Sequence, residues 1–351
     1  MTNRGPLILA IESSCDDTSV AVLQGFNVLS NCVHNQEIHR EFGGVVPEMA
    51  SRAHIQYIVP TILAALRTSK KEFNQLEGIA VTQGPGLQGS LLVGHSMAKS
   101  LSLALTIPLI NVNHIEGHML SCYLVEKGIQ KSSSLEFPYL CLTVSGGHTQ
   151  IVIVKNWDNF EVLGQTLDDS VGEAFDKSAK LLSLDYPGGP IIDRYSKHGN
   201  PDRFVFNKTR MSGVNFSFSG IKTNILQTMQ KEQKISANTL TNDLDDWCAS
   251  IQKSLIAPLV QNTKKAIFNT GIKRLAIAGG VSANTFLRDE ITRLAMKENI
   301  EIYIPPLSYT MDNAAMIGAV GQFSMLNGVY DHVSSSAKAR ITSDKWKYLD
   351  I

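Results

Sequence analysis

The chain has 351 residues, of which 43% are hydrophobic and 18% are charged, and its 32 basic side chains balance its 32 acidic ones. A chain of this length is expected to form about two domains, and its hydrophobic content is enough for each domain to bury a core. The neutral balance excludes nucleic-acid binding through overall charge, so any such contact would need a local basic patch or a partner.

The cysteines and the apolar segments indicate where the protein works. Five widely spaced cysteines without a C-x-x-C pair are typical of a reducing compartment rather than of a disulfide framework, and we predict a cytoplasmic protein. The run "PLILAI" near the start is too short for a signal peptide. The longest apolar stretch, residues 90–110, is interrupted by His95 and Lys99, so no membrane span is predicted.

The first third of the chain contains both strand-like and helix-like segments. Residues 6–33 include the runs "PLILAI", "TSVAVL" and "NVLSNCV", with the polar turn "ESSCDD" between the first two, and this pattern predicts an antiparallel meander. Helices are predicted over 47–68, which begins with a proline, and over 89–105, which follows the strand "GIAVTQ". The polar, serine-rich residues 126–136 are predicted to form a linker or an exposed loop.

The second part of the chain repeats the beginning of the first. Residues 138–166 contain "PYLCLTV", "TQIVIV" and "FEVLGQT", with "SGGH" in the first turn, which predicts a duplicated lobe, although two unrelated hairpins would give the same pattern. Helices are then predicted over 171–183, 242–270, 282–298 and 312–326, with the strands "RLAIAG" and "EIYIP" among them. Strands that alternate with helices predict α/β lobes. The tail from residue 334 is predicted to lie on the surface.

Glycine-rich turns follow several of these strands. Gly84, Gly86 and Gly89 formally match G-x-G-x-x-G between a strand and a helix, but no acidic residue ends the next strand to bind a ribose, so a dinucleotide site is disfavoured. The turn either approaches a phosphate through its backbone or packs tightly. Paired glycines also follow strands at 146–147 and 279–280. Each turn alone is as typical of tight packing, but three in a duplicated chain favour a nucleotide cleft.

His114 and His118 lie four residues apart in "NHIEGHML", which places both on one face of a predicted helix. Their Cβ atoms would be about 5–6 Å apart, close enough for both imidazoles to bind one Zn, Fe or Mn ion, although such a pair also arises by chance. Zinc proteases need a glutamate directly after the first histidine, whereas Glu116 comes one residue later and points away. A third ligand is needed, and Asp312, between a strand and a helix, is the candidate.

Nine blocks spread along the chain form a distinctive set. They are "IESSCDDTSVAVL", "FGGVVPEMASRAH", "GPGLQGSLLVGHSMAKSL", "NHIEGHML", "VSGGHTQIV", "VGEAFDKSAKLLSLDYPGGP", "FSFSGIKT", "AGGVSANTFLR" and "DNAAMIG". Together they closely resemble the tRNA N6-adenosine threonylcarbamoyltransferase family, the bacterial TsaD group once described as O-sialoglycoprotein endopeptidases. The resemblance runs from about residue 7 to 325, and it departs from the family pattern at Thr310 and Met311, where Cys-Thr is usual.

The resemblance implies an α/β, actin-like (ASKHA, sugar-kinase-type) fold with two duplicated lobes and a central cleft. The lobes would be residues 1–133 with about 310–330, and residues 134–309, followed by a tail over 331–351. It implies that His114, His118 and Asp312 bind one divalent metal, usually iron and sometimes zinc, and we expect this ion to join the two halves of the molecule. It also implies substrate contacts from Thr143, Val144, Ser145, Gly146, Gly147, Asp176, Gly189, Asp193 and Asn284.

The implied reaction moves a threonylcarbamoyl group from threonylcarbamoyl-AMP to N6 of the adenosine 3′ to the anticodon, position 37, in tRNAs that read codons beginning with A. The activated carbonyl needs alignment and charge stabilisation rather than a covalent enzyme nucleophile. Asp16 or Asp17 in "ESSCDD" is a candidate to accept the amine proton, unless the turn is simply solvated. The implied partners are tRNA, a smaller TsaB-type paralogue and a small TsaE-type ATPase.

Three other functions stay open at this point. An ATP-dependent small-molecule kinase of the same fold would share the cleft, but it leaves the histidine pair unexplained. A metallopeptidase is disfavoured because of the position of Glu116. A non-catalytic scaffold paralogue is disfavoured because the chain retains His114, His118 and Asp312.

Overall fold

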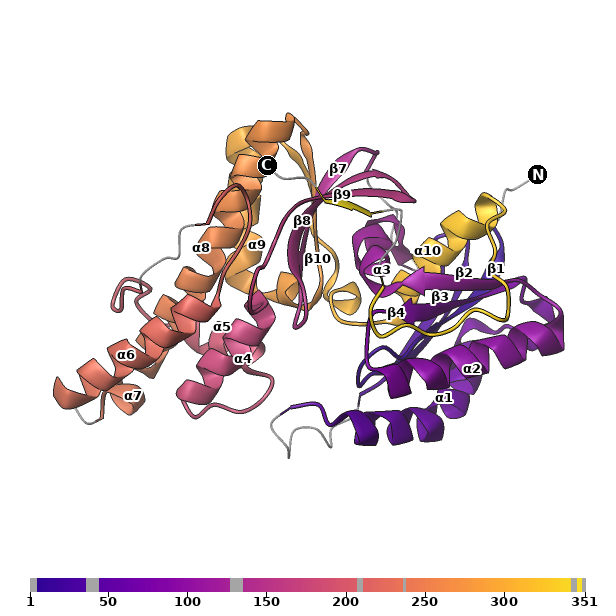
Figure 1. Cartoon of the computed structure of the whole chain (residues 1–351), viewed down its shortest axis with the longest axis horizontal. Helices are drawn as coiled ribbons and strands as arrows, with labels where there is room; N and C mark the ends of the chain where they lie inside the picture. The colour runs from indigo at the N-terminus through magenta and orange to yellow at the C-terminus, as the bar shows by residue number, and fades with distance from the viewer. Residues whose placement is uncertain are drawn as a thin grey trace. The chain divides into compact units, whose positions relative to one another are not determined.

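The computed structural model describes residues 5–35, 44–126, 135–206, 211–235, 238–341 and 346–348. The chain divides into two compact units. Unit 1 comprises Met1–Leu135 and Pro306–Ser343, and unit 2 comprises Glu136–Pro305 and Asp344–Ile351. Each unit is built on a mixed β-sheet with helices packed against it (Figure 1).

The sheet of unit 1 begins with the predicted meander. Its strands lie in the order β5-β4-β1-β2-β3-β6, in which β1 pairs with β2 and β2 with β3 in antiparallel directions. The pairs β1–β4, β4–β5 and β3–β6 are parallel. The strands are β1 (Leu7–Glu12), β2 (Thr18–Gln24), β3 (Asn27–His34), β4 (Gly78–Gly84), β5 (Leu109–Asn113) and β6 (Val125–Glu126).

Helices pack on both faces of this sheet, so its central strands are apolar almost without interruption. Leu9 and Ile11 of β1 pack in one hydrophobic cluster with α1 (Pro47–Ser69) and α2 (Gln88–Leu105). On the other face, Ile8 of β1 and Ala80 of β4 lie against Gly321 of α10 (Ala314–Leu326). The unit also contains α3 (His114–Leu120), η2 (Phe73–Gln75), η3 (Ser121–Tyr123) and η5 (Leu307–Tyr309).

The sheet of unit 2 repeats that of unit 1 strand by strand. Its order is β11-β10-β7-β8-β9-β12, and each neighbouring pair runs in the same relative direction as its counterpart in unit 1. This confirms the predicted duplication over two unrelated hairpins. The strands are β7 (Tyr139–Val144), β8 (Thr149–Asn156), β9 (Asn159–Gln165), β10 (Arg274–Ala278), β11 (Glu301–Tyr303) and β12 (Trp346–Tyr348).

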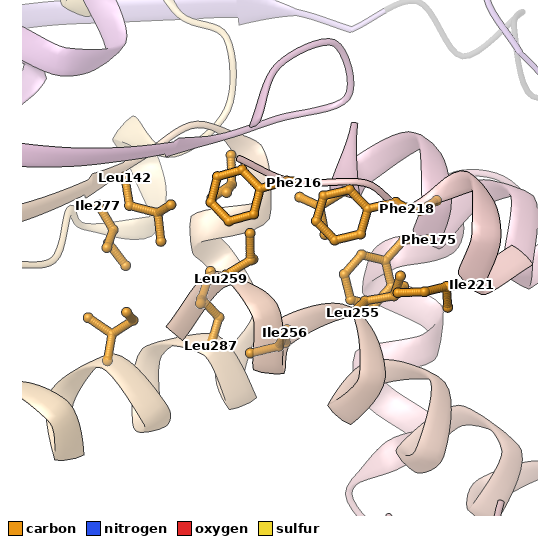
Figure 2. Packing of buried hydrophobic residues seen from close by; sticks show 14 of the residues in the cluster. Leu142, Phe175, Phe216, Phe218, Ile221, Leu255, Ile256, Leu259, Ile277 and Leu287 are labelled. Atoms are coloured by element: carbon orange, nitrogen blue, oxygen red, sulfur yellow. The ribbon is translucent and has the colours of Figure 1, made fainter. Parts of the chain in front are cut away.

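The hydrophobic core of unit 2 lies between its sheet and its helices (Figure 2). Leu142 of β7 and Ile277 of β10 supply the sheet side of this core, and Leu255 and Leu259 of α8 supply the helix side. The long helix α8 ends at Gly271, whose φ of 70° is a left-handed conformation that glycine adopts without strain. The helices are α4 (Val171–Leu181), α5 (Gly188–Ser196), α6 (Ser219–Ile235), α7 (Thr239–Asn242), α8 (Leu244–Thr270) and α9 (Thr285–Glu298), with η4 (Gly280–Ala283).

The described part of the tail lies largely on the surface, as predicted, but it contains a strand that the sequence analysis did not predict. Residues 346–348 form β12, which pairs in parallel with β9, and Lys347 and Tyr348 are exposed. Trp346 stacks on Phe160 of β9, with ring centroids 5.3 Å apart, and this contact gives the short strand an anchor. The predicted linker lies largely outside the described residues. Among the described helices, none combines the length and apolarity needed to cross a bilayer.

We expect the replacement Phe175→Ala to destabilise unit 2 strongly, because the side chain is only 1% exposed in the core beneath α4. Loss of a buried phenylalanine costs about 3–5 kcal/mol of the free energy of unfolding. Phe268→Ala is the matched control, since that ring is 87% exposed on α8, and it should change stability by less than about 0.5 kcal/mol. Urea unfolding followed by circular dichroism measures both, and equal effects would contradict this packing.

Candidate metal centre

The histidine pair lies on the short helix α3, directly after strand β5. The side chain of Asn113 caps this helix by accepting a hydrogen bond from Ile115 N–H at 2.9 Å. All residues of α3 are buried, and the two imidazoles are one turn apart with ring centroids separated by 4.8 Å. The predicted helix and the predicted shared face of His114 and His118 are therefore confirmed.

Asp312 lies two residues before α10, in a segment that is fixed from both sides. The Asn313 side chain caps α10 by accepting a hydrogen bond from Met316 N–H at 3.1 Å. The next residue, Ala314, donates its N–H to Ser19 Oγ of β2 at 2.8 Å. The carboxylate thus projects from a turn whose backbone is held against the sheet.

A glycine allows α3 and α10 to pack closely. A Cβ atom on Gly117 would lie 3.1 Å from the Ile317 side chain and 3.3 Å from that of Met316, which is tighter than ordinary packing. Because Gly117 stands between the two histidines, the missing side chain brings both imidazoles toward the start of α10. This close approach explains how residues almost 200 positions apart meet at one point.

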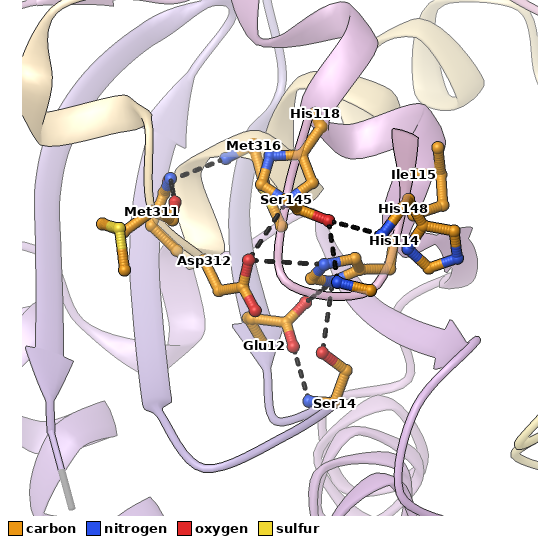
Figure 3. A network of polar contacts seen from close by, with 12 residues as sticks. Glu12, Ser14, His114, Ile115, His118, Ser145, His148, Met311, Asp312 and Met316 are labelled. Atoms are coloured by element: carbon orange, nitrogen blue, oxygen red, sulfur yellow. Dashed lines mark hydrogen bonds and ion pairs between the residues drawn. The ribbon is translucent and has the colours of Figure 1, made fainter. Parts of the chain in front are cut away.

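The three side chains have the spacing of a metal-binding set (Figure 3). Asp312 Oδ1 lies 3.1 Å from His118 Nε2 and 3.4 Å from His114 Nε2. Nitrogen and oxygen ligands about 2.1 Å from one ion are roughly 3.0–3.4 Å apart in octahedral or tetrahedral shells. The ligand atoms of all three residues lie within 4.8 Å of one another. The three residues are therefore a candidate site for a divalent cation, and a set of three protein ligands would leave a coordination position for substrate.

The pKa values in this cluster are shifted by interactions between its negative and positive groups. Burial alone would lower the pKa of His114, but Asp312 and then Glu12 raise it well above its usual value. Burial would raise the pKa of Asp312, but the charge of His114 and its hydrogen bonds hold it well below its usual range. These opposite shifts mean that positive charge stabilises the ionised carboxylates of the cluster, and a metal ion or protons can provide that charge.

The ligand set lies wholly within unit 1, so the expectation that its ion joins the two halves of the molecule is wrong. The reason is that the chain returns to unit 1 at residue 306, before Asp312. Glu116 is buried on α3 but is outside this cluster. At the departure from the family pattern, Thr310 donates its hydroxyl to Leu307 O at 2.9 Å, and the side chain of Met311 is exposed.

Sequence reasoning missed Glu12, a buried carboxylate at the end of β1. Its Oε2 atom lies 3.0 Å from His114 Nδ1, on the side of the imidazole opposite Asp312 (Figure 3). A signal was present, because a glutamate ends the otherwise apolar strand "LILAIE". Burial would raise the pKa of Glu12, but the charge of His114 and its hydrogen bond lower it.

The turn between β1 and β2 holds the two other acidic candidates. His54 of α1 secures this turn, since its Nε2 lies 2.9 Å from Cys15 O and its Nδ1 lies 2.7 Å from Thr18 Oγ1. Asp16 and Asp17 are both half-buried rather than fully solvated. Burial, followed by the negative charges of Asp16, Asp312 and Glu12, raises the pKa of Asp17 to about 7.

The predicted substrate residues Thr143 to Gly147 form the end of β7 and the turn that follows it in unit 2. Gly279, with φ 87°, allows the end of β10 to approach this turn, because a Cβ there would lie 2.4 Å from Val144 O. Gly172 does the same for α4, with a Cβ position 2.6 Å from Ser145 O. In contrast, added Cβ atoms on Gly146 and Gly147 would meet nothing within 4 Å. The turn is packed on one side and open on the other.

The remaining predicted substrate residues lie in α4, in α5 and at the start of α9, and they are used in structural contacts. Asp176 accepts the N–H of Gly188 at 2.8 Å, which joins α4 to the segment containing Gly189. Asp193 accepts from Thr285 Oγ1 at 2.8 Å and links α5 to α9. The Asn284 side chain caps α9 and donates to Gln252 Oε1 at 2.6 Å. The structure places these groups in one unit, with much of their hydrogen-bonding capacity satisfied internally.

The Gly84–Gly86 turn of unit 1 packs against the chain itself. A Cβ on Gly84 would lie 1.9 Å from Lys338 O, and the N–H of Lys338 donates to Gln83 O at 2.7 Å. The N–H of Gly86 donates to Ala339 O at 3.2 Å. Of the two interpretations of this turn, tight packing is correct, and the N–H of Gly86, a donor that a phosphate could use, is taken up by Ala339.

The duplicated sheets and the ligand cluster together define an actin-like α/β protein with a candidate His-His-Asp cation site. The fold is shared with full-length HypF in a phosphate- and nucleotide-bound form, with a TM-score of 0.61 and 12% identity. That match covers 93% of this chain and 48% of HypF, and at this identity it concerns the fold alone.

The chain belongs to the tRNA N6-adenosine threonylcarbamoyltransferase family, because the TsaD family model matches residues 27–319. A relative of that name from Riemerella anatipestifer is 49% identical over 334 residues, which are 95% of this chain and 97% of the relative. Another from Christiangramia forsetii is 50% identical over 333 residues, with the same two coverages. The family resemblance noted in the sequence is confirmed.

We expect Asp17→Asn to change how the stability of the metal-free protein depends on pH. The pKa of Asp17 rises from its usual 3.8 to about 7 in the folded protein, so the folded state binds this proton more tightly than the unfolded state does. The free energy of unfolding therefore falls as the pH rises from about 4 to about 7. Asparagine cannot ionise, so the variant should gain stability relative to the parent across this window, by on the order of 1–3 kcal/mol.

Urea unfolding of both proteins after chelation, at intervals between about pH 4 and pH 8, measures this difference. Subtracting the two curves of unfolding free energy against pH cancels the contributions of the ionisable groups that both proteins share. A difference that stays constant with pH would contradict the raised pKa.

Proposed function

We propose that this chain transfers the threonylcarbamoyl group from threonylcarbamoyl-AMP to N6 of the adenosine at position 37 of tRNAs that read codons beginning with A. The observation that carries the proposal is the family match across most of the chain, together with the intact His114, His118 and Asp312 cluster. An ATP-dependent kinase of the same fold would give this cluster no role, and a peptidase would lack the glutamate next to His114.

The chemistry of the substrates suits a site without a covalent nucleophile. Threonylcarbamoyl-AMP is a mixed anhydride, so its carbonyl is already activated toward an amine. A divalent metal, with Fe(II) first and Zn(II) second, would be held by His114, His118 and Asp312 and would supply Lewis-acid stabilisation of developing negative charge. The imidazoles and the carboxylate would hold the metal ion in place, since all three side chains are anchored by the packing of α3 and α10.

We assign binding of the adenylate to unit 2, at the turn formed by residues 143–147. The open space beside Gly146 and Gly147 supports this assignment, because a phosphate or a ribose can approach the backbone there. Asp176, Gly189, Asp193 and Asn284 would shape this site, chiefly by holding α4, α5 and α9 around the turn.

Asp16 is our first candidate for the proton acceptor, and Asp17 is the alternative from the same turn. The half-burial of both carboxylates supports a role beyond a solvated loop tip. The pKa of Asp17, raised to about 7, lies in the range in which a carboxylate accepts a proton effectively near neutral pH. Comparing the activities of Asp16→Asn and Asp17→Asn would distinguish the two.

The family resemblance further leads us to propose tRNA, a smaller TsaB-type paralogue and a small TsaE-type ATPase as partners. We also propose that the protein works in the cytoplasm. Its five cysteines, all within the described residues, form no disulfide, which is in keeping with a reducing compartment.

We expect His114→Ala and Asp312→Asn to lose both the metal and the reaction product, because each removes one of three ligands. The assay combines the protein with tRNA, threonine, bicarbonate, ATP and the companion proteins, and then measures modified adenosine in the digested tRNA. Product should fall by roughly 100-fold or more, along with the metal content measured by elemental analysis. His332→Ala, at an exposed histidine, is the matched control and should retain both. Undiminished product in His114→Ala would refute the role of the metal.

We expect Gly146→Leu to weaken substrate binding while leaving the fold intact. A Cβ atom at this position meets no protein atom within 4 Å, so the free energy of unfolding should change by less than about 1 kcal/mol. If the adenylate occupies that space, KM for threonylcarbamoyl-AMP should rise by about tenfold or more. Steady-state kinetics with supplied threonylcarbamoyl-AMP checks this, and an unchanged KM in a stable variant would place the adenylate elsewhere.

A further inference from the structure

Glu12 carries a carboxylate that is among the most buried polar groups of unit 1, since the residue is 1% exposed. Three donors surround it. The N–H of Ser14 donates to Oε1, and the hydroxyl of Thr82 donates to Oε2 at 2.5 Å. His114 Nδ1 lies 3.0 Å from the same Oε2 atom (Figure 3). An ionised carboxylate can only accept hydrogen bonds, so each of these neighbours must present a hydrogen.

This requirement fixes the protonation pattern of one imidazole. With the proton of His114 held on Nδ1 toward Glu12, the lone pair of a neutral ring lies on Nε2, which faces Asp312 at 3.4 Å. His118 has no such anchor, because its buried Nδ1 has no hydrogen-bond partner among the described residues. Of the two metal-binding imidazoles, only His114 is therefore held in its tautomer by a carboxylate in the described structure.

We propose that Glu12 is a positioning residue of the metal centre, which holds the Nδ1 proton of His114 so that Nε2 is free to bind the cation. This inference rests on the proposed metal site, and it adds a residue that does not itself touch the ion. A carboxylate behind a metal-binding histidine orients the ring and increases the basicity of the ligand nitrogen.

An isosteric substitution separates this role from simple packing. In Glu12→Gln the amide oxygen must stay opposite the N–H of Ser14, because a backbone donor cannot change its polarity. The amide NH2 then faces Thr82 and His114 Nδ1. The hydroxyl of Thr82 can rotate to accept, but the imidazole can accept only by moving its proton to Nε2. The variant thus keeps the shape of the site and places a hydrogen where the metal should bind.

Ser14 offers a competing explanation, because its Oγ atom lies 3.2 Å from the same Nδ1. If the Nδ1 proton of His114 were donated to the serine hydroxyl oxygen instead of to Glu12, Glu12→Gln would leave the tautomer of His114 unchanged. Ser14→Ala would then disturb that tautomer. Thr82→Val provides a second comparison. It removes another hydrogen bond of the Glu12 carboxylate while leaving the contact with His114 in place.

The test measures Zn²⁺ affinity of the full-length protein by chelator competition, together with histidine ¹⁵N NMR of the metal-free protein. We expect Glu12→Gln to lose roughly 10- to 100-fold in affinity, as replacement of the outer partners of metal ligands does. Thr82→Val and Ser14→Ala should stay within about threefold of the parent. At a pH high enough for the His114 ring to be neutral, its Nδ1 should carry a proton in the parent and should not in Glu12→Gln.

Several results would overturn the proposal. A Glu12→Gln protein with parental affinity, or with the proton of a neutral His114 ring still on Nδ1, would exclude the tautomer role. Should that variant fail to fold, the spectrum of the parent still decides, since an unprotonated Nδ1 there contradicts the proposal. If the parent binds no Zn²⁺ through His114, the metal site fails and this inference fails with it. Equal binding by parent and variant leaves the transferase proposal standing.

Discussion

The site depends on a carboxylate that has no access to water. Glu12 is stable in the interior only because donors from the β1–β2 turn, β4 and α3 converge on it. Asp312 completes the cluster from the segment before α10. The positions of the imidazoles follow from this requirement for compensated charge, and the closely packed helices α3 and α10 preserve the arrangement.

The two sheets have the same topology, but their first turns carry different kinds of residue. The β1–β2 turn of unit 1 carries Asp16 and Asp17, and its backbone is secured by His54. The equivalent β7–β8 turn of unit 2 carries Gly146 and Gly147, which leave space beside the backbone. One copy of the duplicated element therefore carries acidic side chains, and the other leaves space beside its backbone. In the proposed reaction, the first turn would accept a proton and the second would bind the adenylate.

Most of the fold could be predicted from the sequence, because the strands are apolar runs bounded by polar or glycine-rich turns. The spacing of His114 and His118 also predicted their relative position, since side chains four residues apart lie on the same face of a helix. Asp312 was a candidate from its position between a strand and a helix, and the family resemblance supported it. Its contact with the two histidines could not be predicted from the sequence, because the packing of α3 against α10 is tertiary. Glu12 was missed because a single buried acid has no periodic signature, and the partners that explain it come from three separate segments.

The strand near the end of the chain was not predicted, for a related reason. A strand such as β12 is too short to stand out from its neighbours in the sequence, and it forms because β9 offers an edge for pairing. The contacts of residues 338–339 have the same tertiary origin.

The covered glycine turn bears on how such patterns are interpreted. At Gly84 the absence of a side chain serves a peptide carbonyl of the same chain rather than a cofactor. Searches that score only the spacing of glycines will therefore keep returning this segment as a dinucleotide loop. What distinguishes the two cases is a stretch of polypeptide more than 200 residues downstream, which no local motif can contain.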